Sequence, residues 1–134
     1  PFCKVVKSWS IKSKKKIIIV PKISNNELVH IAINDKTEFS INEYGIEEPN
    51  NGNSFIIENL DLIFIPLLAY DLEGHRVGYG MGYYDKFLKL TNKSSLKIGL
   101  SFFDPINKIQ DIDDNDVKLD YCITPTQVHK FDHI

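Results

Sequence analysis

Cysteine, arginine and long hydrophobic runs are all scarce in this sequence of 134 residues. Its two cysteines, Cys3 and Cys122, lie far apart and form no Cys-x-x-Cys pair. A disulfide scaffold or a zinc ribbon is therefore not expected, and the default compartment is a reducing, cytoplasmic one. The longest apolar run, over residues 62–69, contains Pro66 and is too short to cross a bilayer. With no signal-peptide pattern visible either, no membrane association is expected.

Neither sign of charge is in large excess. The 16 basic and 18 acidic residues give a formal net charge of -2, so the sequence lacks the basic field typical of proteins that bind nucleic acid. Hydrophobic residues make up 43% and charged residues 25%, as is ordinary for a globular protein. The length is that of one domain, and we expect a single domain over residues 1–134. Because the sequence starts at Pro1 instead of Met, we also expect that this domain lacks its N-terminal segment.

Apolar patterning predicts strands that alternate with helices, which is typical of an α/β domain. A β-branched run over residues 17–20 predicts a strand that Pro21 ends, whereas the many Gly, Pro and Asn residues of 37–54 predict mostly irregular structure. The continuously apolar stretch 60–65 predicts a strand with both faces covered. Further strands are expected at 28–33, 97–103 and 121–124, helices at 3–13 and 83–90, and an acidic, weakly structured connection at 107–120.

The rare residue types gather in one glycine-rich stretch that precedes the predicted helix. Arg76 is the only arginine and Met81 the only methionine, and four of the seven glycines lie here: Gly74, Gly78, Gly80 and Gly82. Glycines let a ligand approach the backbone closely, and successive N–H groups followed by a helix N-terminus favour an anion. Arg76 can contact two phosphate oxygens with its planar guanidinium, and Asp85 is a hard oxygen ligand suited to Mg²⁺. Together these features predict a phosphoryl-transfer site.

Generic nucleotide-binding motifs do not describe this stretch. Tyr83 stands where a Gly-x-Gly-x-x-Gly motif needs its third glycine, and no Gly-Lys-[Ser/Thr] of a Walker A loop follows. The alternative interpretation is a flexible hairpin with surface charges, in which Arg76 is a solvated loop residue. His75 also lies in this stretch, and we expect it to be a surface histidine. The acidic run 111–116 matches the first ligand positions of a calcium loop, but it lacks the required glycine and glutamate, so most of its carboxylates are expected to be solvated.

The specific string is more informative than any generic motif. Residues 66–71 (Pro-Leu-Leu-Ala-Tyr-Asp) and 74–88 (Gly-His-Arg-Val-Gly-Tyr-Gly-Met-Gly-Tyr-Tyr-Asp-Lys-Phe-Leu) closely resemble the signature of the 5-formyltetrahydrofolate cyclo-ligase family, also called methenyltetrahydrofolate synthetases. The resemblance extends from about Lys15 onward and includes three outlying segments and one residue: 45–49 (Gly-Ile-Glu-Glu-Pro), 98–102 (Ile-Gly-Leu-Ser-Phe), 116–120 (Asp-Val-Lys-Leu-Asp) and Thr124.

This resemblance implies an enzyme that couples ATP hydrolysis to the closure of a ring. In that family the formyl oxygen of 5-formyltetrahydrofolate attacks the γ-phosphate of ATP. N10 then attacks the phosphorylated iminium, and phosphate leaves to give 5,10-methenyltetrahydrofolate and ADP. The implied partners are therefore ATP, Mg²⁺ and a formyl-folate, with or without a polyglutamate tail. The implied fold is a three-layer α/β/α sandwich with a mixed, mostly parallel sheet, similar to the ribose-isomerase and CoA-transferase group. The expected oligomeric state is a monomer or weak dimer.

The resemblance also implies which residues form the site. Arg76 and Tyr83 are the catalytic candidates, and Asp85 and Asp116 are the Mg²⁺ candidates, with Asp120 next in line for the metal. ATP binding is assigned to Arg76 and the residues that follow it: Val77, Gly78, Tyr79, Gly80, Met81, Gly82, Tyr83 and Tyr84. The border of the folate site is assigned to Tyr79, Gly80, Met81, Gly82 and Tyr83, where an aromatic face would suit a pterin.

One part of the family pattern has no counterpart in this sequence. The family places basic phosphate contacts on an N-terminal helix, and a substrate-contacting glutamate in a segment before the present start. Three hypotheses therefore stay open. The protein is an ATP-dependent cyclo-ligase, a non-catalytic nucleotide- or folate-binding module on the same fold, or a structural or interaction protein in which the glycine-rich loop is a remnant of the scaffold.

Overall fold

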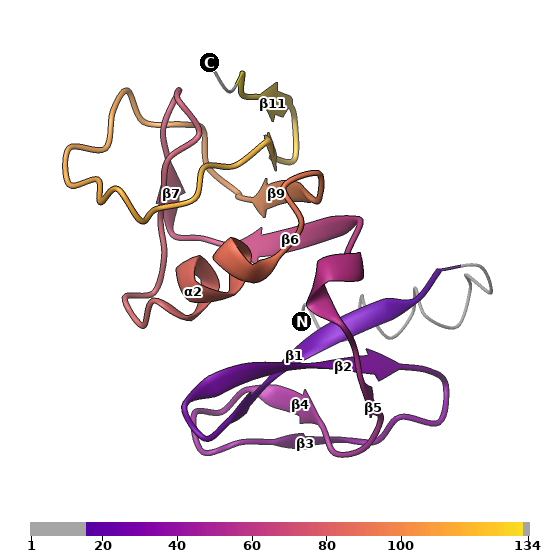
Figure 1. The fold of residues 1–134 in the computed structure, drawn as a ribbon. Helices are drawn as coiled ribbons and strands as arrows, with labels where there is room; N and C mark the ends of the chain where they lie inside the picture. The colour runs from indigo at the N-terminus through magenta and orange to yellow at the C-terminus, as the bar shows by residue number, and fades with distance from the viewer. Residues whose placement is uncertain (1–15, 133–134) are drawn as a thin grey trace. The chain divides into compact units, whose positions relative to one another are not determined.

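A computed structural model describes residues 16–132 of the chain (Figure 1). The helix predicted for residues 3–13 lies outside this range. The chain divides into two compact units, Pro1–Ile56 and Ile57–Ile134, which are described here one after the other. Whether the two units form one domain, as the length suggests, stays a prediction.

The first unit is built from two antiparallel hairpins. The longer one pairs β1 (Ile18–Ser24) with β2 (Glu27–Ile33), and β5 (Asn53–Ser54) extends its sheet beyond β2. Its two-residue turn is Asn25-Asn26, with φ of 51° and 62°. Asparagine tolerates this left-handed conformation, and a two-residue turn of this kind matches the twist of the strands that it joins. The shorter hairpin pairs β3 (Phe39–Ile41) with β4 (Glu47–Pro49).

One expectation for this unit is wrong. Pro21 does not end the first strand, because β1 continues to Ser24 with Pro21 opposite His30. A proline is tolerated there because, within residues 16–132, β1 has a hydrogen-bonded strand on one side only. Most of residues 37–54 lie outside strands, as expected, although the segment also contains the short strands β3, β4 and β5.

Contacts between distant parts of the chain stabilise the short strands of this unit. The Glu48 carboxylate accepts a hydrogen bond from the Ile23 backbone N–H (2.8 Å), and the Lys22 ammonium donates to the Pro49 carbonyl (3.1 Å). Both contacts join β1 to β4, over 25 and 27 residues of sequence. No local pattern reports such pairings, which explains why the strands were missed.

The second unit contains a four-stranded mixed sheet in the order β11-β10-β9-β6. The strands β6 (Leu62–Pro66), β9 (Leu96–Leu100) and β10 (Tyr121–Ile123) are parallel, and β11 (Val128–Lys130) runs antiparallel to β10. The connection from β6 to β9 contains a short hairpin, β7 (Ala69–Tyr70) and β8 (Arg76–Val77), and the helix α2 (Tyr83–Leu90) (Figure 1). A single 3-10 turn, η1 (Ile57–Asn59), precedes β6. The predicted α/β class with a mixed sheet is confirmed, and β6, β9 and β10 are its parallel strands.

Burial within this unit differs from the prediction along β6. Ile63 and Ile65 are buried, at 7% and 1% exposure, whereas Leu62 and Phe64 are 41% and 39% exposed. The expectation that both faces of this strand are covered is therefore wrong. Successive side chains of a strand point to opposite faces of the sheet, so this alternation shows that one face of β6 is buried and the other is partly exposed.

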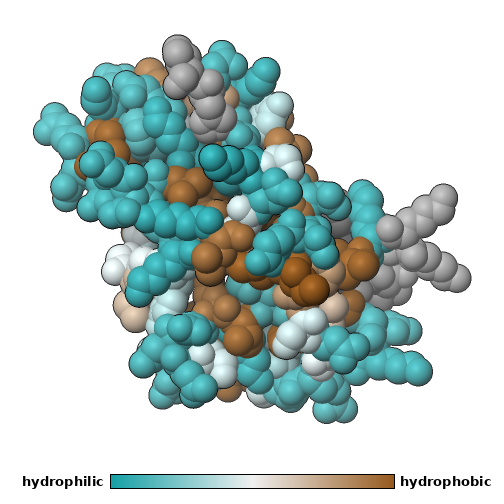
Figure 2. Space-filling view, viewed as in Figure 1, coloured by the Kyte–Doolittle hydropathy of each residue, from teal (hydrophilic) through white to brown (hydrophobic). Residues whose placement is uncertain are grey.

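The core of the second unit forms around Ile65, Tyr70, Leu119 and Cys122, each no more than 1% exposed. Cys122 is thus a core residue, and burial raises the pKa of its thiol to about 11. At neutral pH this cysteine is protonated and has no thiolate character. No helix of residues 16–132 is long and apolar enough to span a membrane. On the face that Figure 2 shows, hydrophilic residues cover most of the surface.

Candidate phosphoryl-transfer site

The β7–β8 hairpin determines the position of Arg76. Its antiparallel register places Ala69 opposite Val77 and Tyr70 opposite Arg76, and the Leu68 N–H donates to the Val77 carbonyl (2.8 Å). The Arg76 side chain is only 4% exposed. The alternative interpretation of Arg76 as a solvated loop residue is therefore wrong.

The guanidinium of Arg76 joins three segments of the second unit. Its Nη2 donates to Asp85 Oδ1 (2.6 Å) in the first turn of α2, and its Nη1 donates to the Val117 carbonyl in the connection before β10. The Val117 N–H in turn points at the same Asp85 oxygen (3.4 Å). These two donors use part of the five N–H groups of an arginine, and within residues 16–132 the others donate to no recorded partner. The result is a guanidinium fixed in direction that keeps donors for an anion.

The two carboxylates predicted to bind Mg²⁺ belong to adjacent segments. Asp85 is 32% exposed, and its contact with Val117 places it beside the segment that carries Asp116. Asp116 accepts from the Asp113 N–H at Oδ2 (3.0 Å). Within the described residues, the second oxygen of each carboxylate has no hydrogen-bond partner, so each side chain retains an oxygen for a cation. No group of three or more metal-ligating side chains occurs among residues 16–132. Two carboxylates nevertheless fit Mg²⁺, which keeps waters and substrate oxygens as its other ligands.

Asp120, the next candidate for the metal, has a different position. Its Oδ2 accepts from the Lys97 N–H (2.7 Å) and lies 3.9 Å from the Lys97 ammonium. The Asp120 N–H donates to the Lys97 carbonyl (2.9 Å), so this residue attaches the end of the acidic connection to β9. These contacts favour a structural role for Asp120.

The glycine loop, residues 78–82, is exposed along its whole length and opens onto α2. Gly80 and Gly82 have φ of 84° and 66°, which residues with a side chain rarely adopt. Around Gly78, Gly80 and Gly82 an added Cβ would meet nothing within 4 Å, so the space beside the backbone is open. Gly82 is the N-cap of α2 and contributes no side-chain cap. The N–H groups of the first helical turn therefore stay available to an anion.

The aromatic residues predicted around this loop take two kinds of position. Tyr79 and Met81 are 67% and 61% exposed, as a surface that contacts a ligand requires. Tyr83 and Tyr84 begin α2 and are half-buried. Tyr84 packs edge-on against Phe87, with ring centroids 6.3 Å apart, and burial raises the pKa of its hydroxyl. The structure thus brings all the predicted site residues into one connected region from β8 to α2 and the segment of Asp116.

Sequence reasoning missed two buried residues next to this region. Asp71 is completely buried (0% exposed) and His75, expected at the surface, is 9% exposed. Nδ1 of His75 lies 3.1 Å from Asp71 Oδ2, and the backbone N–H groups of Glu73, His75 and Ile109 also donate to the Asp71 carboxylate. The only available signal was the aspartate at the start of a turn-like Asp-Leu-Glu-Gly segment, where its side chain can accept from nearby N–H groups.

The buried carboxylate of Asp71 predicts a loss of stability in acid. Burial on its own raises the pKa of Asp71, but the N–H groups of Ile109, His75 and Glu73 and the His75 side chain outweigh it and lower the pKa below its usual value. This contribution to stability is complete above the unfolded pKa of about 4 and is lost as the pH falls through the folded pKa. We expect the difference in unfolding free energy between the wild type and Asp71→Asn to narrow from about pH 6 to about pH 3. Urea unfolding at a series of pH values measures this difference. A difference that does not change with pH would contradict a lowered pKa of Asp71 in the folded state.

A second prediction concerns the turn of the β7–β8 hairpin. Gly74 has φ of 85°, and a Cβ there would lie 2.9 Å from Phe131 Cγ and 3.0 Å from the Leu119 carbonyl oxygen. Gly74→Ala is expected to destabilise the fold by about 1–3 kcal/mol, because both the backbone conformation and the packing oppose the methyl group. Gly78→Ala is the matched control, since its φ is not in the left-handed region and its surroundings are open. Thermal melts of both variants test this prediction. Equal melting temperatures for Gly74→Ala and Gly78→Ala would refute it.

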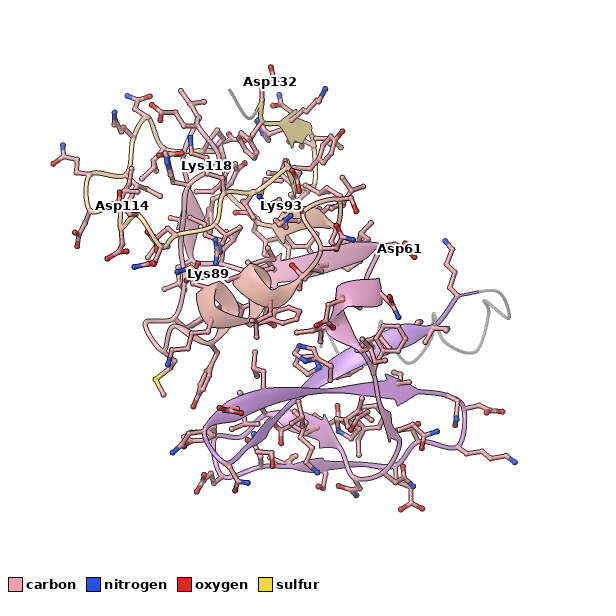
Figure 3. The ribbon with its side chains drawn as sticks, viewed as in Figure 1. Asp61, Lys89, Lys93, Asp114, Lys118 and Asp132 are labelled. Carbon is pink, nitrogen blue, oxygen red and sulfur yellow. The ribbon has the colours of Figure 1, made fainter. Side chains whose placement is uncertain are left out.

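A cavity among the described residues lies elsewhere in the second unit. It encloses about 380 Å³ and is lined by Leu72, Glu73, Lys118, Lys130, Phe131 and Asp132, of which Figure 3 labels Lys118 and Asp132. None of the predicted site residues lines it. The glycine loop, by contrast, is open surface, as suits a site that a second element or a large substrate covers.

The described residues form an α/β fold with a mixed sheet, in which a glycine loop, a buried arginine and two carboxylates lie in one region. The chain belongs to the 5-formyltetrahydrofolate cyclo-ligase family, whose model matches residues 5–125. The resemblance seen in the sequence is thereby confirmed.

Several individual proteins of this family are similar to the chain. Over 134 aligned positions it is 30% identical to a probable 5-formyltetrahydrofolate cyclo-ligase of Schizosaccharomyces pombe, with 89% of this chain and 66% of that protein covered. A 52-residue segment is 48% identical to the cyclo-ligase of Mycoplasma genitalium, covering 39% of this chain and 32% of that protein. Among solved structures, the NMR structure of 5,10-methenyltetrahydrofolate synthetase from Aquifex aeolicus aligns with a TM-score of 0.77 and 30% identity, covering 99% of this chain and 64% of that one. The synthetase of Mycoplasma pneumoniae aligns with a TM-score of 0.59 and 26% identity, covering 80% and 55%. The chain thus spans two thirds or less of the length of these relatives.

Proposed function

We propose that the protein containing this chain is an ATP-dependent 5-formyltetrahydrofolate cyclo-ligase. It would convert 5-formyltetrahydrofolate to 5,10-methenyltetrahydrofolate through phosphorylation of the formyl oxygen, with release of ADP and phosphate. Family membership supports the proposal, and one observation carries it: Arg76 is held by Asp85 and Val117 beside an open glycine loop and a helix N-terminus. This is the equipment that a transferred phosphoryl group needs, because catalysis there consists mainly of alignment and neutralisation of charge.

Each part of the site has a proposed role in this reaction. Arg76 binds phosphate oxygens, with Asp85 and Val117 holding its guanidinium in one orientation. The residues from Val77 to Tyr84 surround the triphosphate, and their open backbone lets it approach closely. The residues from Tyr79 to Tyr83 border the folate, where the exposed Tyr79 offers an aromatic face to a pterin. Tyr83 lies at the start of α2, where a phenolic hydroxyl can contact the reacting groups.

Mg²⁺ is assigned to Asp85 and Asp116, which both retain a carboxylate oxygen without a partner in residues 16–132. When bound there, the ion would neutralise charge on the phosphate oxygens. Asp85 then has two tasks, since the same carboxylate also orients Arg76.

The wider properties of the protein are proposals of the same kind. The two compact units are proposed to belong to a single domain, with the three-layer α/β/α arrangement expected for the family. We further propose a cytoplasmic enzyme that acts as a monomer or weak dimer and accepts folates with or without a polyglutamate tail. Neither nucleic acid nor a membrane is a proposed partner.

The decisive experiment is a spectroscopic assay for the methenyl product. Full-length protein and the 134-residue chain are each mixed with 5-formyltetrahydrofolate, ATP and Mg²⁺. The proposal requires product together with ADP and phosphate, one for one, and no product with a non-hydrolysable ATP analogue. Turnover without ATP would exclude the phosphorylation mechanism. Binding of ATP or folate without turnover by the full-length protein would favour a non-catalytic binding module instead.

A further inference from the structure

The Asp71 carboxylate is a hydrogen-bonded centre that the proposed reaction does not use directly. Its Oδ1 accepts from the N–H groups of Glu73 and His75, both at 2.9 Å. Its Oδ2 accepts from the Ile109 N–H (3.0 Å) and faces His75 Nδ1 (3.1 Å). Both oxygens are therefore fully used, and the residue is 0% exposed. A buried carboxylate is tolerated only with such complete hydrogen bonding.

The groups that Asp71 binds all belong to segments around Arg76. Glu73 and His75 form the turn of the β7–β8 hairpin, and Arg76 follows His75 directly. Asp71 also closes the turn with its own backbone, since its N–H donates to the His75 carbonyl (3.0 Å) and its carbonyl accepts from the Gly74 N–H (3.2 Å). Both the side chain and the backbone of Asp71 thus hold the turn that leads into β8.

The same turn is hydrogen-bonded to the segment around Val117, whose carbonyl accepts from the Arg76 guanidinium. The Gly74 carbonyl accepts from the Leu119 N–H (2.9 Å), two residues beyond the Val117 carbonyl that Arg76 binds. Ile109, whose N–H donates to Asp71, lies at the beginning of the connection that leads to Val117. The backbone on both sides of the Arg76 side chain is therefore anchored close to this carboxylate.

We propose that Asp71 is a positioning residue for Arg76: its buried carboxylate fixes the β7–β8 turn so that the guanidinium meets Asp85 and the Val117 carbonyl. A guanidinium binds through directed N–H groups, so a small displacement of the turn removes it from its partners. His75 contributes as one of the four donors to the carboxylate, and its ring is too buried to contact a substrate. The catalytic consequence of this inference rests on the proposed function, but the positioning itself does not.

The sole arginine makes the positioning directly observable. In this chain the Nε–H group of Arg76 gives the only arginine side-chain signal in a two-dimensional ¹H–¹⁵N spectrum, and Arg76→Lys assigns it by its loss. Asp71→Asn has nearly the same shape but presents an N–H group where the Ile109 N–H needs an acceptor. We expect this variant to shift or broaden the Arg76 signal while most backbone amide signals stay in place.

Asp120→Asn is the matched control for this measurement. It also changes a carboxylate that accepts from a backbone N–H in the second unit, but its partner is Lys97 on β9 and not the hairpin. The Arg76 signal should be unchanged in it. If Asp71→Asn does not fold, His75→Phe replaces it, because this change removes one of the four donors and keeps the size of the ring. An unchanged Arg76 signal in a folded Asp71→Asn or His75→Phe variant would overturn the proposal.

A double-mutant cycle extends the test to catalysis. Asp71→Asn is expected to lower kcat by about 10- to 10²-fold, as small misplacements of a binding group do. In an Arg76→Ala background the same change should lower kcat by less than about twofold, because the residue through which it acts is gone. Equal losses in both backgrounds would assign Asp71 a role independent of Arg76. If wild-type protein shows no turnover, the proposed function fails, and the Arg76 signal alone decides the positioning.

Discussion

Arg76→Ala is expected to lower kcat by about 10²–10³-fold, comparable to the loss of one preorganised donor to a transition state. The side chain lies beside the glycine loop, and its guanidinium has a single orientation set by Asp85 and Val117. Arg76→Lys should restore only part of the activity, because lysine keeps the charge but not the planar geometry. Steady-state kinetics of both variants measures the effect, and a near-normal kcat for Arg76→Ala would show that the assigned role is wrong.

Stability has to be measured beside these kinetics. From the sequence, Arg76→Ala would change stability by no more than about 0.5 kcal/mol, as for an exposed residue. The Arg76 side chain is 4% exposed, and its removal leaves the Val117 carbonyl without its side-chain donor and Asp85 with only the longer contact to the Val117 N–H. We therefore expect a loss of about 1–3 kcal/mol. Assays are therefore run well below the melting temperature of each variant. Lys89→Ala is the matched control. Lys89 is an exposed cation on α2 (Figure 3), and it donates to Asn115 in the connection that also carries Val117. This substitution should leave kcat unchanged.

Asp85→Asn is expected to have the second largest effect, with a fall in kcat/KM of roughly 10²-fold or more and a raised Mg²⁺ requirement. The loss has two causes, because Asp85 is both a proposed metal ligand and the partner of Arg76. Asp116→Asn should raise the Mg²⁺ requirement but lower kcat less, since Asp116 makes no recorded contact with Arg76. Mg²⁺ titrations of activity separate the two effects.

Asp114→Asn is the control for these titrations. It lies in the same acidic connection, is exposed and makes no recorded contact within residues 16–132. If Asp116→Asn requires no more Mg²⁺ than Asp114→Asn does, Asp116 is a solvated loop residue after all. The role would not pass to Asp120, which is occupied with Lys97.

The sequence by itself determined the α/β class, the main strands of the second unit and the helix at 83–90. It also located the site, because the rare residues and glycines between Gly74 and Asp85 form one continuous string. These features depend on neighbouring residues: apolar periodicity over a few positions, β-branched runs, and glycines whose backbone must adopt left-handed φ. Family membership is visible in the same local string.

Only the tertiary structure decided how far the site residues are buried and which distant residues hold them in place. The burial of Arg76, its contact with Val117 and the saturation of Asp71 by His75 and Ile109 depend on partners up to 41 residues away. The short strands of the first unit, and the continuation of β1 beyond Pro21, likewise depend on pairing with strands elsewhere in the sequence. Such contacts form because buried N–H groups, carbonyls and charges must all find partners when the chain folds. The sequence shows which polar and charged groups are present, but not which of them pair with one another. That pairing determines which groups can take part in binding or catalysis.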